Sequence, residues 1–157
     1  CRHWGLAFGR SRVREFVDAA TALTEAVKRK HAIVHPEHAD LGFLYGTILT
    51  DGGDGRADRA TRNVCVFADA EVDRSPTGSG VTARLAAMHA KGEIGEGETR
   101  LFESITGARF CGEVLRRARI GHHDGIVARV SGRAHYTGRA EYWLEEGDEL
   151  GKGFLLR

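Results

Sequence analysis

The residues Asp73, Thr77, Gly78 and Ser79 have types and spacing that suit the binding of an amino acid. Asp73 precedes a Ser-Pro turn, and the other three follow that turn directly before a run of small apolar residues. If this run is a helix, the backbone N–H groups of its first turn have no partner in the helix and can bind a carboxylate. The Asp73 carboxylate can meet a positively charged nitrogen. An acid beside an anion site predicts that an amino acid is held by both ends.

A plain turn followed by a helix cap is the other interpretation of the same residues. Gly-Ser-Gly often precedes a helix, with the serine, here Ser79, capping it and the glycines relieving crowding. The segment is not a dinucleotide fingerprint, because the third glycine is absent. It is not a phosphate loop either, because the Gly-Lys-Ser/Thr ending is absent. Spacing alone leaves both the binding site and the turn open.

Three other pairs of residues are of types that can bind a metal ion. They are His35 with His38, His122 with His123, and Asp51 with Asp54. Neither histidine pair has a third ligand at a supporting spacing. The aspartates lack the calcium-loop spacing and the distal glutamate. We interpret all three pairs as residues of loops and turns.

Two helices and at least six strands are expected to position the candidate site. Residues 15–30 repeat apolar side chains at helical spacing. Residues 80–90 are apolar on nearly every side, so this helix is expected to be surrounded by sheet. Residues 63–69 form a nearly continuous apolar run, which predicts a strand buried on both faces. The other predicted strands cover residues 43–49, 99–106, 108–116, 125–130 and 133–146.

The strand predicted at residues 133–146 has the clearest pattern, because apolar and polar residues alternate along it. With the two helices, these strands indicate an α+β domain. A chain of 157 residues is long enough for one such domain and too short for two.

Composition narrows the class of protein. Apolar residues make up 41% and charged residues 29%, with a net charge of +1, so we expect no nucleic acid or membrane partner. No apolar run approaches a membrane span, and no signal-peptide pattern opens the chain. The three cysteines, Cys1, Cys65 and Cys111, are an odd number at unrelated spacings, which indicates reduced thiols in the cytoplasm. A first residue other than methionine is typical of a fragment.

Several segments closely resemble the proline racemase superfamily. They are "HPEHADLGFLYGTILTDG", "VFADAEVDRSPTGSGVTARLA", "FESITGARFCGEV" and "SGRAHYTGRAEYWLEEGDELGKGFLLR". The resemblance makes residues 15–157 the C-terminal-half domain of a proline racemase-like enzyme and leaves residues 1–14 as an atypical N-terminal segment. It implies a diaminopimelate epimerase-like half, in which a curved, mostly antiparallel sheet or barrel surrounds a central helix. The active site of such enzymes lies between two similar halves.

Thr77 distinguishes branches of this family. In its racemases and hydroxyproline epimerases a catalytic cysteine follows Ser-Pro, and threonine at that position marks the trans-3-hydroxy-L-proline dehydratases. A threonine hydroxyl is far too weak an acid to exchange protons as a thiol does. With a base on one face only, a carbanion at Cα can expel a C3 hydroxyl as water. The resulting enamine tautomerises to pyrroline-2-carboxylate. The resemblance therefore implies a hydro-lyase in which Thr77 lines the pocket without acting as a base.

The resemblance also implies roles for the neighbouring residues. Asp73 would bind the substrate nitrogen, while Gly78 and Ser79 would donate backbone N–H groups to its carboxylate. These bonds strengthen as charge spreads from Cα into the carboxylate, which lowers the barrier. The resemblance implies no metal and no organic cofactor. The partner expected is a small-molecule substrate, in cytoplasmic amino-acid catabolism.

The base cysteine of the family lies in a Cys-Gly-His segment that this sequence does not contain. Cys1 is followed by Arg-His, Cys65 by Val-Phe and Cys111 by Gly-Glu. We therefore expect a substrate-binding half without the base, whose exposed half-site favours a homodimer. Two alternatives stay open. One is a proline or hydroxyproline racemase or epimerase, against which Thr77 argues. The other is a catalytically inactive half that binds a proline-like ligand or a partner chain.

Overall fold

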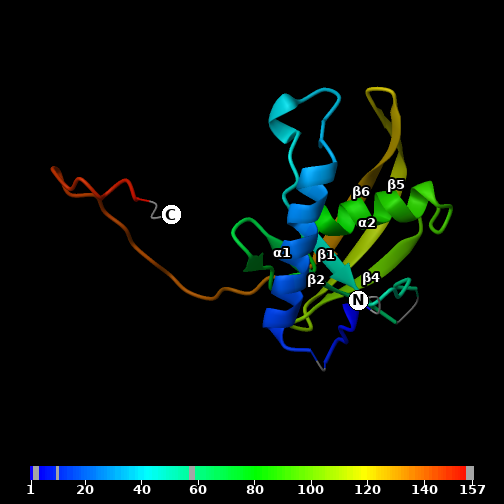
Figure 1. The fold of residues 1–157 in the computed structure, drawn as a ribbon, viewed down its shortest axis with the longest axis horizontal. Coiled ribbons are helices and arrows are strands. Elements are labelled where there is room, and N and C mark those ends of the chain that lie inside the picture. The colour runs from blue at the N-terminus through cyan, green and yellow to red at the C-terminus, as the bar shows by residue number, and fades with distance from the viewer. Residues whose placement is uncertain (2–3, 10, 57–58, 155–157) are drawn as a thin grey trace.

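The computed structural model describes residues 1, 4–9, 11–56 and 59–154, which form two helices and a curved six-stranded sheet (Figure 1). The elements follow in the order α1 (Val13–Lys30), the 3-10 turn η2 (Ala39–Leu41), β1 (Gly46–Thr50), β2 (Thr61–Phe67), β3 (Glu71–Val72), α2 (Gly78–Ala90), β4 (Thr99–Ser104), β5 (Arg109–Ile120) and β6 (His123–Gly132). Both predicted helices are confirmed, and each begins two residues earlier than predicted.

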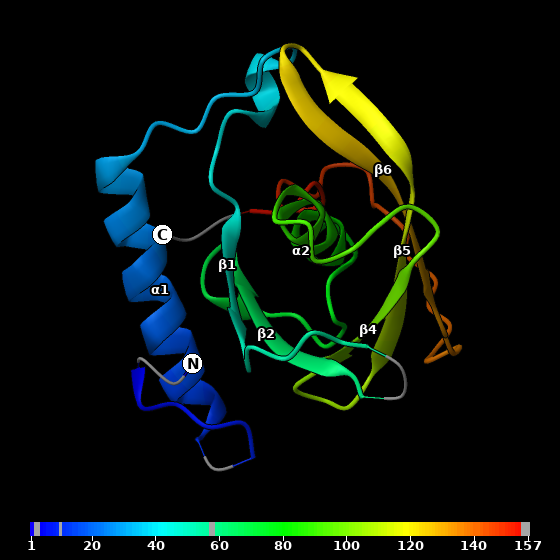
Figure 2. The same ribbon diagram turned by 90° about the vertical axis from the view of Figure 1, so that its right-hand side faces the viewer.

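The sheet bends around α2. Its strands lie in the order β1-β2-β4-β5-β6, and β3 pairs with β2. Every pairing is antiparallel except that of β2 with β4, which is parallel. In Figure 2, α2 is seen inside the curve of the sheet, and α1 lies outside it against β1 and β2. The predicted fold, a mostly antiparallel curved sheet around a central helix, is confirmed.

Strand β2 is buried on both faces, as its apolar run predicts. Val64 and Val66 point toward α1, where they join a core cluster. Thr61, Asn63 and Cys65 alternate with them on the opposite face, toward α2. The side chains between sheet and central helix are thus partly polar, and the candidate site is built above them. The α1 cluster comprises Phe16, Ala20, Leu49, Val64 and Val66.

Helix α2 is enclosed because its apolar residues meet the sheet on several sides. Gly112 of β5 allows a close approach: a Cβ atom there would lie 2.8 Å from Leu85 of the helix. The cluster around α2 comprises Val81, Leu85, Met88, Ile94, Phe102 and Val114. Neither helix, in the part of the chain that the structure describes, is both long and apolar enough to cross a bilayer.

Residues 133–146 do not form the strand that their alternation predicts. After β6 ends, the chain leaves the sheet and runs away from the domain (Figure 1). Tyr136 is 106% exposed, Tyr142 91% and Trp143 75%, so both sides of the segment face solvent. Alternation defines two faces of a strand, but a strand also needs a neighbour for its backbone hydrogen bonds. Among the described residues, none pairs with this segment.

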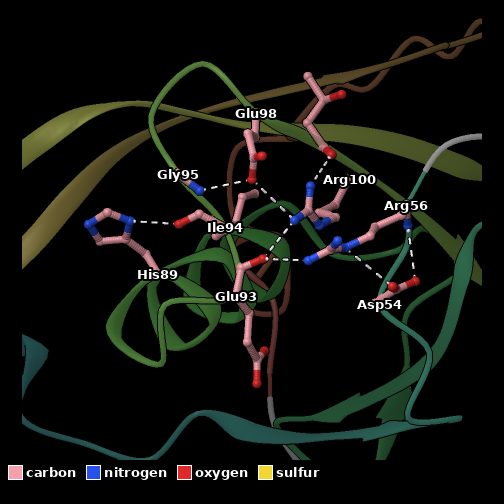
Figure 3. A network of polar contacts seen from close by, with 9 residues as sticks. Asp54, Arg56, His89, Glu93, Ile94, Gly95, Glu98 and Arg100 are labelled. Atoms are coloured by element: carbon pink, nitrogen blue, oxygen red, sulfur yellow. Dashed lines mark hydrogen bonds and ion pairs between the residues drawn. The ribbon is translucent and has the colours of Figure 1, made fainter.

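Buried Arg100 fastens the loop that follows α2 to the start of β4 (Figure 3). Its guanidinium donates hydrogen bonds to the Glu93 carbonyl at 2.7 Å and the Thr99 carbonyl at 2.8 Å, and it meets the Glu98 carboxylate at 3.3 Å. Arg56 donates a further bond to the Glu93 carbonyl at 3.3 Å. The C-terminal end of α2 is therefore held independently of its N-terminal end, where the candidate site lies.

Replacing Arg100 with leucine is expected to lower the free energy of unfolding by about 2–4 kcal/mol, because the Thr99 carbonyl loses a donor and the Glu93 carbonyl loses the nearer of its two donors in a partly buried setting. Urea denaturation followed by circular dichroism measures this. The matched control is Arg117→Leu, since the Arg117 side chain is 79% exposed and its ion pair with Glu96 is screened by water. That change should cost less than about 0.5 kcal/mol. Equal losses in the two variants would contradict the role of Arg100.

Candidate functional site

The first two residues of α2 are open to solvent. Gly78 and Ser79 are exposed, and a Cβ atom on Gly78 would meet no other atom within 4 Å. The N–H of Val81 donates to the Thr77 carbonyl at 2.8 Å, which is the first bond of the helix. The N–H groups of Gly78, Ser79 and Gly80 therefore have no partner inside the helix. This is the geometry expected of a carboxylate-binding helix N-terminus.

Thr77 is the N-cap residue of α2, and its backbone is strained. Its φ of +70° and ψ of 110° are rare for a β-branched residue and cost about 1–3 kcal/mol. Its hydroxyl does not cap the helix but donates a 2.7 Å hydrogen bond to Oδ2 of Asp73. Ser79 lies inside the helix and not at the cap, which differs from the plain-turn interpretation.

Asp73 is held as an acceptor by the residues that follow it. The Ser75 N–H donates to Oδ1 at 2.8 Å, and the Thr77 hydroxyl donates to Oδ2. Partial burial raises the pKa of Asp73, but the hydrogen bonds from Thr77 and Ser75, together with the charge of Arg74, hold it below its ordinary value. Asp73 is thus an anion at neutral pH. Each oxygen keeps a lone pair for a cationic ligand.

Replacing Thr77 with valine is expected to raise the pKa of Asp73, because one donor to its carboxylate is lost. A carboxyl with a lowered pKa in the folded state stabilises the fold above its unfolded pKa, and this contribution is lost as the pH falls through the folded pKa. The contribution of this bond to stability should therefore be present at neutral pH and absent in acid. Carbon-13 NMR of the Asp73 carboxyl group during a pH titration measures the shift.

The matched control for this change is Thr24→Val on α1. Its hydroxyl is hydrogen-bonded to that of Thr47 at 2.7 Å, and that pair belongs to a different part of the sheet. The pKa of Asp73 should not change in this variant. An unchanged pKa in Thr77→Val would show that the hydroxyl bond does not set the charge state of the site.

Cys65 lies directly beneath the site, a position that the sequence did not predict. The Asp73 N–H donates to the Cys65 carbonyl at 3.0 Å. Burial raises the pKa of the Cys65 thiol, and the charge of Asp73 adds to this rise against an opposing hydrogen bond with Thr77. The thiol is therefore protonated at neutral pH. Cys111 and Gly112 are consecutive residues of β5, so they point to opposite faces of the sheet. Because Gly112 faces α2, Cys111 lies on the other face.

An open hollow of about 710 Å³ begins at Asp73, a volume typical of sites for small molecules. Its walls come from the turn that contains Arg74, the β4–β5 turn, and the first residues after β6. Arg109, Arg133 and His135 add basic side chains to it. Thr77, Gly78 and Ser79 do not line it, so the hollow and the helix N-terminus meet at Asp73. The structure brings Asp73 and Thr77 into contact and places Gly78 and Ser79 on the adjoining open turn.

The other candidates lie away from this site. A second hollow, of about 560 Å³, lies beside His89 near the C-terminal end of α2, and none of the predicted site residues lines it. Nδ1 of His35 accepts backbone hydrogen bonds from Glu37 and His38, as in an ordinary turn. Within residues 1, 4–9, 11–56 and 59–154, no three His, Cys, Asp or Glu side chains gather closely enough to hold a metal ion.

Two solved structures that are similar to this chain are described as a probable proline racemase and a hydroxyproline epimerase. A probable proline racemase from Agrobacterium radiobacter K84, with bound carbonate, has a TM-score of 0.84 and 28% identity over 97% of this chain and 44% of its own. A hydroxyproline epimerase from Agrobacterium vitis, with bound trans-4-hydroxy-L-proline, has the same TM-score and identity over 97% of this chain and 43% of its own.

The proline racemase family model matches residues 1–155, and the chain therefore belongs to the proline racemase family. It is 53% identical to the trans-L-3-hydroxyproline dehydratase of Mus musculus and 51% identical to the trans-3-hydroxy-L-proline dehydratase of Homo sapiens, in each case over 98% of this chain. It is 38% identical to the trans-3-hydroxy-L-proline dehydratase of Burkholderia cenocepacia over 94% of this chain. The chain spans 44% of the length of each of these curated relatives.

Proposed function

We propose that this chain carries the substrate-binding half-site of a hydro-lyase that converts trans-3-hydroxy-L-proline to pyrroline-2-carboxylate. The observation that carries the proposal is the bond from the Thr77 hydroxyl to Asp73. Thr77, the residue after Ser-Pro, does not ionise at neutral pH, and its hydroxyl is already bonded to Asp73. This face of the pocket therefore offers no base. The sequence identity to curated trans-3-hydroxy-L-proline dehydratases supports trans-3-hydroxy-L-proline as the substrate. Racemisation, which needs a base on each face, is not favoured.

In this proposal the chain binds and polarises the substrate. Asp73 accepts hydrogen bonds from the substrate's ring ammonium. The first N–H groups of α2 bind its carboxylate and stabilise the charge that develops there as the Cα proton is removed. The electron pair left at Cα forms the Cα=C3 double bond while the C3–O bond breaks. The leaving oxygen takes up a proton and departs as water, and the enamine tautomerises to the cyclic imine.

The proposal assigns the base to a residue that does not belong to this half-site. The thiol of Cys65 contacts Thr77, but its raised pKa keeps it protonated at neutral pH. Cys111 lies on the far face of β5. The base then faces Asp73 from another part of the complete enzyme. We propose further that the three free cysteines reflect a cytoplasmic location, and that the open half-site favours a homodimer.

The test is proton NMR of trans-3-hydroxy-L-proline incubated with the folded 157-residue chain, beside a full-length dehydratase relative as the active control. We expect the chain to bind the substrate while the Cα and C3 signals persist. Disappearance of these signals with formation of the imine would mean that the chain supplies its own base, and Cys65, the thiol beside Thr77, would be the first residue to replace. Absence of binding would overturn the substrate assignment.

A further inference from the structure

Two buried polar side chains lie side by side beneath the site. Asn63 of β2 has 0% of its surface exposed, and Ser104 of β4 has 1%. They are register partners in the parallel pairing of these strands. Polar groups are buried at a cost unless they are hydrogen-bonded, so the partners of these two side chains indicate their role.

Asn63 holds the carbonyl group of Pro76. Its Nδ2 donates to that carbonyl at 3.1 Å, while its Oδ1 faces the guanidinium of Arg84 at 3.5 Å. A carbonyl only accepts and a guanidinium only donates, so the orientation of the amide is fixed by its two neighbours. Arg84 is itself held by the Thr61 hydroxyl at 2.9 Å and by the ring of Phe102, 4.9 Å from its Cζ.

Ser104 holds the carbonyl group of Arg74. Its hydroxyl donates to that carbonyl at 2.6 Å, and the neighbouring hydroxyl of Thr106 approaches the same oxygen at 2.6 Å. The carbonyl groups on either side of Ser75 are thus held from below, one by β2 and the other from the end of β4. Above them, the Ser75 N–H binds Asp73 and the Ser75 hydroxyl accepts the Thr77 N–H at 3.0 Å.

We propose that Asn63 and Ser104 are positioning residues, which fix the peptide between Asp73 and Thr77 so that the Asp73 carboxylate and the first turn of α2 face one ligand. The inference rests on the proposed function. The strained backbone of Thr77 supports it, because a β-branched residue keeps a positive φ only where surrounding contacts impose it. The two buried side chains supply those contacts without touching the substrate.

The test compares Asn63→Leu with Thr61→Val in the full 157-residue chain. Both changes remove a partner of Arg84 from the same face of β2, but only Asn63 contacts the 74–76 peptide. Asn63→Leu is expected to raise the pKa of Asp73, measured by carbon-13 NMR without ligand. It should also weaken binding of trans-3-hydroxy-L-proline roughly tenfold or more. Thr61→Val should change neither quantity.

A second variant keeps the test decisive if Asn63→Leu does not fold. Ser104→Ala with Thr106→Val removes both hydroxyls from the Arg74 carbonyl at the end of β4 and should act in the same direction. A folded variant with an unchanged pKa of Asp73 and unchanged affinity would overturn the positioning role. If the unaltered chain fails to bind trans-3-hydroxy-L-proline, the proposed function fails instead, while the ligand-free pKa still tests the positioning role.

Discussion

Replacing Asp73 with asparagine is expected to remove most of the affinity for trans-3-hydroxy-L-proline. Asparagine keeps an oxygen for the Ser75 N–H, so the turn should persist, but the charge that meets the substrate ammonium is lost. Losing a charge-assisted hydrogen bond of this kind costs about 2–3 kcal/mol, or roughly 30- to 160-fold in Kd. Titration of the substrate into isotope-labelled chain, followed by backbone amide shifts, measures the change.

Asp54→Asn is the matched control for this experiment. Asp54 is exposed and pairs with Arg56 at 3.4 Å, in a turn that contributes nothing to the hollow at Asp73. Its replacement should leave the affinity unchanged. If Asp73→Asn binds the substrate within about twofold of the unaltered chain, the nitrogen of the substrate is held elsewhere and the site assignment is wrong.

Replacing Phe102 with alanine is expected to lower the free energy of unfolding by about 3–5 kcal/mol, more than the replacement of Arg100. Phe102 is 0% exposed and belongs to the core cluster between β4 and α2. The change leaves a cavity against the helix, and it removes the ring on which the Arg84 guanidinium rests. A loss of this size is a large share of the 5–15 kcal/mol typical of a domain. Urea unfolding at neutral pH measures it.

Phe43→Ala provides the comparison. Phe43 is 55% exposed and contacts Tyr45 edge to face, so its removal should cost less than about 1 kcal/mol. Similar losses in the two variants would mean that α2 is not enclosed as described. A selective loss in Phe102→Ala would confirm that the sheet and the central helix share one core.

The two helices and strand β2 could be predicted because the spacing of their apolar residues reflects which of their faces are buried. The one-sided periodicity of α1 reflects contact with the sheet on a single face, and the all-round apolarity of α2 reflects contact on several. The nearly continuous apolar run in β2 reflects the two helices on its two faces. The apolar pattern does not mark where a helix starts, because Gly78 and Ser79 begin α2 without contributing to it.

Residues 133–146 show the limit of such patterns. Their alternation is as regular as that of any strand, but pairing depends on whether a neighbour with free backbone groups lies beside them. The sequence of the segment does not contain that information. The side chains of Tyr136 and Tyr142 are therefore exposed despite the favourable pattern.

The site itself could be predicted only in part. The Ser-Pro turn and the glycines indicated Asp73 and the helix N-terminus, and the family resemblance singled out Thr77. The bond between Thr77 and Asp73 depends on the positive φ of Thr77, for which threonine gives no local signal. The roles of Asn63 and Ser104 depend on carbonyl groups 13 and 30 residues away along the chain, which only the folded topology brings near.

The backbone of Thr77 has a consequence for protein engineering. Glycine would adopt its φ of +70° without steric strain, so a selection for thermal stability alone would tend to replace this threonine. The substitution would also delete the hydroxyl that binds Asp73. Programmes that improve the heat resistance of this family by removing unfavourable backbone conformations should therefore leave position 77 unchanged and make their substitutions elsewhere.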